Sequence, residues 1–203
     1  MIVIFEGPDR IGKDTQIQKF IENFSIKQNL NSFKIWHKLH YSKPPGNTKE
    51  EQELYSREMY SQFLRFIKNN IMNPLYESLN LVVNRSHIGE SVYANLYRGY
   101  SGSYVFDLEN DIIGTIPPEQ IIDNLFLVTL VPRPGHVDML IARNDDESFY
   151  SDLETATTEV IQFIDSHNKT SIPTENKILV EVSKGESIQD ISDKIKKFFN
   201  DRI

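Results

Sequence analysis

The segment that decides the fold is GPDRIGK at positions 7–13. The apolar run IVIF at 2–5 comes directly before it and has the length of a buried strand, while apolar residues at helical spacing follow it over 17–24. The two glycines and the lysine have the spacing G-x-x-x-x-G-K, in which backbone N–H groups at a helix N-terminus surround a phosphate. This order of strand, loop and helix predicts a phosphate-binding loop, with Lys13 reaching the phosphate oxygens.

The residue after this lysine departs from the pattern. Asp14 stands where a Ser or Thr hydroxyl normally holds Mg²⁺, and Thr15 follows it. Because Mg²⁺ favours carboxylate oxygens, Asp14 is a candidate metal ligand, although its charge also lies close to the polyphosphate. The alternatives are a shifted role for Thr15, a weakened metal site, or a loop that has lost turnover. The expected cofactors are ATP and Mg²⁺, held by Gly7, Asp9, Gly12, Lys13, Asp14 and Thr15.

The rest of the chain alternates strands with helices. Further runs with the character of strands lie at 32–40, 79–83, 125–131 and 178–182. Helical patterns separate them, including a long one over 49–69. This alternation predicts an α/β protein with three layers, in which a five-stranded parallel sheet carries helices on both faces. Ligands of such sheets bind beyond the carboxyl ends of the strands, so the phosphate loop and the segment at Arg85 are expected to share one crevice.

Composition limits the classes of function. The chain has 203 residues, enough for one sizeable core, so we expect a single domain over 1–203. The net charge of −7 argues against extended nucleic acid as a partner and favours a small phosphorylated ligand. The apolar N-terminal run is too short to span a membrane, so no membrane partner is expected. The absence of cysteine excludes thiol chemistry and fits a reducing cytoplasm, the expected location.

Three polar segments carry few apolar anchors and are predicted to be mobile loops. They lie at 98–110, 142–151 and 166–177. The second is expected to form a small lid.

Residues 5–15, FEGPDRIGKDT, resemble the F-E-G-x-D-R-x-G-K-S-T of the thymidylate kinase family, and more narrowly of the phage-type deoxynucleoside monophosphate kinases. The turn KPPGNT at 43–48 resembles R-E-P-G-G-T, and NRS at 84–86 with Tyr93 resembles D-R-Y-x-x-S-x-x-A-Y-Q. The resemblance follows the chain in order from the first strand to the last helix. It implies a P-loop kinase that moves the γ-phosphoryl group of ATP onto a deoxynucleoside monophosphate. It also allows a homodimer, because relatives often dimerise.

The resemblance implies a role for each of four cations. Lys13 neutralises the transferring phosphoryl group, and Arg85 grips the acceptor phosphate. Arg10 corresponds to the loop arginine that stabilises the developing negative charge, with Arg143 in the lid as the second choice. A solvated charge is the competing interpretation of Arg143. Phosphoryl transfer depends on positioning and charge compensation, which such side chains supply.

The acceptor pocket is expected to involve Asp9 at the sugar hydroxyl and Tyr93 against the sugar, as the resemblance implies. Tyr93 also lies in an aromatic segment in which packing competes with recognition. In the long helix, Phe63 or Phe66 is a candidate for stacking on the base, although aromatic residues at this spacing usually belong to the core. The identity of the base stays open.

Two alternatives to a monophosphate kinase remain. A kinase for deoxynucleosides or for modified bases needs a carboxylate base near the second strand, and residues 32–45 contain no Asp or Glu. A binding or regulatory protein would have kept the phosphate loop and lost turnover, with departures at Asp14, Pro44 and Asn84. His87, close to Arg85, is interpreted as a packing histidine, because transfer between phosphates needs no proton donor.

Overall fold

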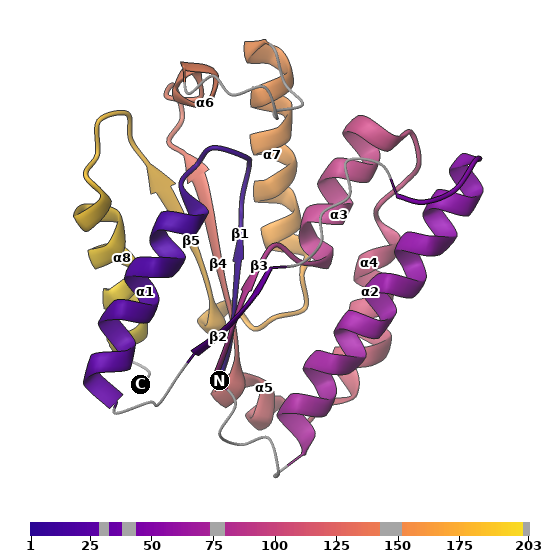
Figure 1. The fold of residues 1–203 in the computed structure, drawn as a ribbon, viewed down its shortest axis with the longest axis horizontal. Coiled ribbons are helices and arrows are strands. Elements are labelled where there is room, and N and C mark those ends of the chain that lie inside the picture. The colour runs from indigo at the N-terminus through magenta and orange to yellow at the C-terminus, as the bar shows by residue number, and fades with distance from the viewer. Residues whose placement is uncertain (29–32, 38–43, 74–79, 143–151, 201–203) are drawn as a thin grey trace.

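The computed structural model describes residues 1–28, 33–37, 44–73, 80–142 and 152–200. Its centre is a five-stranded parallel sheet with the order β2-β3-β1-β4-β5. The strands are β1 (Ile2–Glu6), β2 (Phe33–His37), β3 (Asn80–Asn84), β4 (Leu125–Pro132) and β5 (Lys177–Val182). β1 lies between β3 and β4, so the loop that follows it starts at the middle of the sheet (Figure 1).

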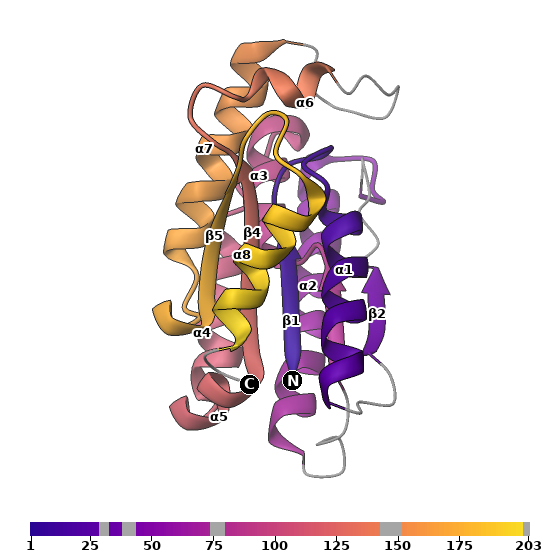
Figure 2. The ribbon, with the colours of Figure 1, turned by 90° about the vertical axis from the view of Figure 1, so that its left-hand side faces the viewer.

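Helices cover both faces of this sheet. α1 (Lys13–Gln28) and α8 (Ile188–Asn200) lie on one side, as Figures 1 and 2 show. The other side carries α2 (Lys49–Met72), α3 (His87–Tyr93), the π-helix η2 (Ala94–Arg98), α4 (Tyr104–Ile112), α5 (Pro118–Asn124) and α7 (Leu153–Lys169). The short α6 (Asp138–Ala142) lies at the carboxyl end of the sheet. The predicted α/β class, with a parallel sheet between two helical layers, is confirmed.

The alternation of β1 side chains explains why this strand is central. Ile2 and Ile4 pack in a cluster with residues of α2, whereas Val3 and Phe5 pack in the cluster that includes α1 and α8. All four side chains are at most 2% exposed. A strand that is buried on both faces must be apolar throughout, which is what the run at 2–5 indicates.

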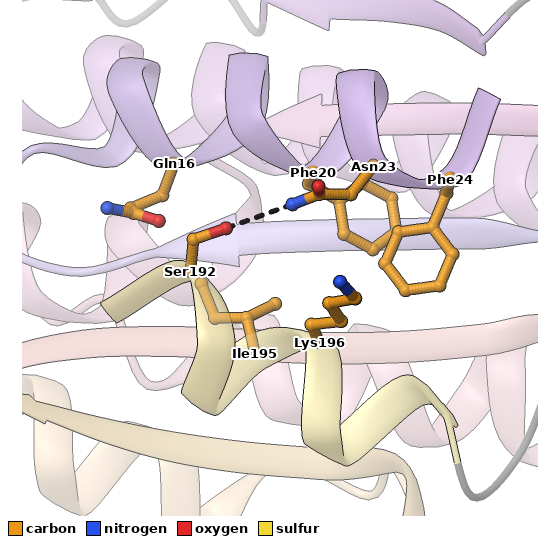
Figure 3. Close-up of a pocket in the computed structure, with 7 residues that line it drawn as sticks. All are labelled: Gln16, Phe20, Asn23, Phe24, Ser192, Ile195 and Lys196. Carbon is orange, nitrogen blue, oxygen red and sulfur yellow. Dashed lines mark hydrogen bonds between the residues drawn. The ribbon is translucent and has the colours of Figure 1, made fainter. Parts of the chain in front are cut away.

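A phenyl cluster joins α1 to α8. Phe20 lies 4.6 Å from Phe24 and 5.0 Å from Phe199, measured between ring centroids. Beside these rings, Asn23 Nδ2 donates to Ser192 Oγ at 3.1 Å (Figure 3). The narrow hollow at this seam lies between packing residues of the two helices, and we assign it no ligand.

The prediction of a loop over 98–110 is wrong from residue 104 onward, where α4 begins. A buried polar network orders this segment: the Arg98 guanidinium donates to Glu90, which also accepts from Tyr100 Oη at 2.9 Å and from Tyr104 Oη at 3.1 Å. The buried Val105 and the tyrosines around a buried carboxylate thus anchor the segment. A single buried acceptor of this kind is invisible to hydrophobic periodicity.

The prediction of a loop over 166–177 is also wrong in part. α7 continues to Lys169, and a 3₁₀ turn over Thr174–Asn176 leads directly into β5. The buried Asn176 amide holds this turn, since Nδ2 donates to the carbonyl oxygens of Ile122 and Leu125 at 2.7 and 2.9 Å. Of the predicted lid at 142–151, only Ala142 lies inside the described residues. Within those residues, no helix is both long and apolar enough to cross a membrane.

Candidate functional site

The loop between β1 and α1 has the backbone of a phosphate cradle. Gly7 and Gly12 have φ values of 134° and 99°, and Arg10 has a φ of 67°. A Cβ on Gly7 would lie 2.1 Å from the carbonyl oxygen of Leu130 in β4, so only glycine fits there. A non-glycine residue in the left-handed region is strained, and such strain collects at functional sites.

Lys13, the first residue of α1, folds back over this loop. Its Nζ donates to the carbonyl oxygens of Gly7 and Pro8, each at 2.7 Å. Burial, and then repulsion from the Arg85 guanidinium, lower the pKa of Lys13 to about 8. The lysine is therefore held inside the loop that it is predicted to serve, and its proton is less firmly bound than that of a surface lysine.

Asp9 joins the two cations of the site. Its carboxylate accepts a hydrogen bond from Arg85 and lies 4.0 Å from Lys13 Nζ. Arg85 has a φ of 68°, and its backbone N–H donates to the carbonyl oxygen of Phe5 at 3.0 Å. The structure thus places the Arg85 guanidinium beside the phosphate loop, although 72 residues separate Arg85 from Lys13. The predicted contact of Asp9 with a sugar hydroxyl would require this carboxylate to share its oxygens with Arg85.

Glu6 is a site residue that sequence reasoning did not assign. It is fully buried at the end of β1 and accepts from Ser86 N and Ser86 Oγ, both at 2.6 Å, and from Gly89 N at 3.2 Å. Burial raises the pKa of Glu6. Its three hydrogen bonds tie the end of β1 to the start of α3, and so fix the segment that carries Arg85. The sequence signal that could have identified Glu6 is its position directly after the four apolar strand residues at 2–5.

Asp14 and Asn84 meet across the site. The Asn84 amide, at the end of β3, donates to the Asp14 carboxylate in the first turn of α1. Asp14 and Thr15 are exposed, so both remain open to a ligand. Oxygen ligands such as these suit Mg²⁺, which usually keeps several waters and needs only one or two carboxylates beside substrate phosphates. In the part of the chain that the structure describes, no three His, Cys, Asp or Glu residues are grouped so that they could hold a metal ion by themselves.

Tyr93 lies beside Arg85. The Arg85 guanidinium is 5.8 Å from the centre of its ring, within the range of a cation–π contact. Tyr93 is 2% exposed, and its ring stacks on Tyr97 at 6.0 Å. Both hydroxyl groups donate to Glu159 of α7, at 3.4 Å from Tyr93 and 2.6 Å from Tyr97. Sequence reasoning missed Glu159, although it interrupts the apolar stripe of α7.

The remaining candidates divide between the site and the core. Arg10 Nη1 donates to the carbonyl oxygen of Leu140 in α6 at 3.2 Å, so this guanidinium points along the loop toward α6. Phe63 and Phe66 pack in the core cluster of α2, with Phe63 centred 6.2 Å from the His87 ring. In the structure both phenyl groups therefore pack with the core, which was the alternative to stacking on the base. Arg143 lies outside the described residues.

His87 has the packing role expected of it. It is 1% exposed, and its Nε2 lies 3.3 Å from Glu109 Oε1. Glu109 also accepts from Thr170 Oγ1 at 2.5 Å, which ties α4 to the segment after α7.

No protein-family model matches the chain, and the search of curated proteins found no relative. Solved structures do match. The YorR protein of Bacillus subtilis, in complex with phosphorylated GDP, is 16% identical with a TM-score of 0.60, covering 98% of this chain and 96% of its own.

Thymidylate kinases from Ehrlichia chaffeensis and Candida albicans are 15% and 13% identical, with TM-scores of 0.55 and 0.60. Each comparison covers 98% of this chain, and 98% and 91% of the respective kinases. At such identities the likeness shows the fold alone: the chain folds as these thymidylate kinases do over nearly its whole length.

Proposed function

We propose that this protein is a nucleoside monophosphate kinase that transfers the γ-phosphoryl group of ATP to a deoxynucleoside monophosphate. The observation that carries the proposal is the convergence of Lys13 and Arg85 on Asp9 at the mouth of the phosphate loop. A loop built for one phosphate, with a second cation from a different strand beside it, suits a reaction between two phosphorylated molecules. The kinase fold of the structural neighbours supports the same class.

The proposed reaction uses the chain mainly for positioning and charge. The N–H groups of the loop and the Lys13 ammonium hold the β- and γ-phosphates of ATP, and Arg85 leaves Asp9 to grip the acceptor phosphate. An acceptor oxygen attacks the γ-phosphorus, the bond to the β-phosphate oxygen breaks, and its electron pair stays on ADP. No general base is required because the attacking phosphate oxygen is already ionised.

Other residues complete the proposed site. Arg10, anchored at Leu140, is the first candidate for stabilising the charge of the transition state, with Arg143 as the second. Tyr93 limits the space beside the acceptor sugar, and Asp9 contacts its hydroxyl. We retain one catalytic domain over 1–203, and leave the base open because Phe63 and Phe66 are engaged in the core.

Asp14 and Asn84 are proposed to form the metal-binding pair. The family that this chain resembles has a hydroxyl group at the position of Asp14 and a carboxylate at the position of Asn84. This chain has the carboxylate at position 14 and an amide at position 84. Both arrangements carry one negative charge, and the hydrogen bond between Asp14 and Asn84 shows that the two side chains lie together. When bound, Mg²⁺ would neutralise charge on the β- and γ-phosphate oxygens.

This exchange predicts a double-mutant result. Asp14→Ser and Asn84→Asp should each weaken Mg²⁺-dependent ATP binding by about 10- to 100-fold, the loss typical of a disturbed metal shell, and the double variant should recover most of it. Calorimetry of ATP binding with and without Mg²⁺ measures the effect. Asp190→Ser, the same change in the first turn of α8, is the matched control. Better phosphoryl transfer by Asp14→Ser alone would instead indicate a decayed site.

The direct test of function is ADP release from Mg-ATP by the purified protein. The panel of acceptors contains dTMP, dUMP, dGMP, dCMP, dAMP, 5-hydroxymethyl-dUMP, the ribonucleotides and the free deoxynucleosides. We expect transfer to at least one deoxynucleoside monophosphate. The purines belong in the panel because the YorR structure contains a guanine nucleotide. Transfer only to nucleosides would reassign the acceptor, and ATP binding without transfer would indicate a binding or regulatory protein.

A further inference from the structure

Glu159 is a buried acidic residue that the proposed reaction does not use. It lies in the middle of α7, is 0% exposed, and faces α3 and η2. Among the ion pairs of the described ranges, none includes this carboxylate; its hydrogen bonds come from the Tyr93 and Tyr97 hydroxyl groups. Burying a carboxylate without a cation is costly, so a purely structural position would normally hold a neutral residue.

The contacts of Glu159 lead to the acceptor site through one ring. The Tyr93 hydroxyl donates to Glu159 Oε1, and the face of the same ring lies 5.8 Å from the Arg85 guanidinium. Phe163, one turn further along α7, meets the Tyr93 ring edge-on at 5.7 Å. α7 therefore holds both the hydroxyl group and the edge of the ring against which Arg85 rests.

The backbone around Tyr93 supports a functional role. α3 ends at Tyr93, and the π-helix η2 begins at the next residue. π-Helical turns are rare and are found frequently at functional sites. Here the π-helix carries Tyr97, whose hydroxyl group makes the shorter of the two bonds to Glu159, at 2.6 Å.

We infer that Glu159 is a positioning residue of the acceptor site, which holds Tyr93 through its hydroxyl group so that the ring supports Arg85 and the acceptor sugar. The inference rests on the proposed function and deepens it. The ionised carboxylate is the form that holds the tyrosines best, because a hydrogen bond to a charged acceptor is about twice as strong as one to a neutral acceptor.

The charge of Glu159 changes near neutral pH. Burial raises its pKa to about 7, the tyrosine hydroxyl groups and Lys13 oppose this rise, and Asp9 adds to it. Among the described residues, these four side chains, on the loop, α1, α3 and η2, are the titratable groups that act on its pKa. As pH rises through about 7, Glu159 ionises and positions Tyr93, so kcat/KM for the acceptor should rise.

The test compares Glu159→Gln with the wild-type protein over pH 5.5 to 9 as approximate limits, with ATP saturating and the acceptor varied. We expect about a 10-fold loss in kcat/KM for the acceptor at pH 8, the loss typical of one hydrogen bond to a charged group, with KM for ATP unchanged. The variant should also lose the rise near pH 7. A merely structural role would move neither KM nor the pH profile.

Two further variants keep the result interpretable. Tyr93→Phe keeps the ring and removes the bond to Glu159, so it should reproduce the loss, and the double variant should be no worse than either single one. Glu109→Gln removes another buried carboxylate, which bonds Thr170, and should affect stability while leaving the pH profile intact. A wild-type pH profile in folded Glu159→Gln overturns the inference alone, whereas a wild-type protein that phosphorylates no acceptor overturns the proposed function and this inference together.

Discussion

Replacing Lys13 with methionine is expected to lower kcat by about 10²- to 10³-fold, the loss that follows from removing one group aimed at transition-state charge. Methionine keeps the aliphatic chain and removes the ammonium group that the loop holds at the carbonyl oxygens of Gly7 and Pro8. Because the interaction strengthens as charge develops on the transferring group, kcat should fall together with kcat/KM. Steady-state kinetics with the best acceptor of the panel measures both.

The fold of this variant must be verified, since Lys13 is only 6% exposed and two carbonyl oxygens lose their donor. Thermal unfolding and far-ultraviolet circular dichroism serve this purpose. Lys19→Met, on the same helix, removes a lysine from an exposed ion pair with Glu22 and should leave turnover intact. Undiminished kcat in folded Lys13→Met would contradict the proposed mechanism.

Replacing Arg85 with alanine is expected to raise KM for the acceptor by about 100-fold while changing ATP affinity little, because two charge-assisted hydrogen bonds to a phosphate are lost. The backbone strain stays the same, since alanine and arginine both carry a Cβ at the observed φ of 68°. KM for the acceptor in Arg85→Lys should lie between the values for the wild-type protein and Arg85→Ala, because lysine keeps the charge and loses the planar pair of donors. Acceptor kinetics and ATP calorimetry measure the two affinities separately.

The same variant has a second readout in the protein without nucleotide. The Arg85 guanidinium helps to lower the pKa of Lys13 to about 8, so its removal should raise the pKa of Lys13. Equal weakening of ATP and acceptor binding would show that Arg85 does not act at the acceptor.

Local patterns account for the parts of the fold that were predicted correctly. The strand at 2–5 is apolar at every position because helices cover both of its faces, and the glycines of the loop adopt positive φ values that a short loop requires. At both 98–110 and 166–177, a buried polar side chain contributes to the order. Glu90 of α3 accepts hydrogen bonds from the first segment, and Asn176 lies within the second.

The sequence by itself predicted the α/β class and the loop between β1 and α1, because each depends on neighbours within one strand, turn or helix, and the resemblance proposed Lys13 and Arg85 as site residues. Only the tertiary structure brought Asn84 to Asp14, Ser86 to Glu6 and Tyr97 to Glu159, across 70, 80 and 62 residues. Read along the chain, Asp14 and Asn84 are two separate departures from a motif; in space they are one hydrogen-bonded pair. Such pairs depend on which strand ends lie side by side at one edge of the sheet. The hydrophobic pattern of the sequence does not predict which donors will bind a buried carboxylate.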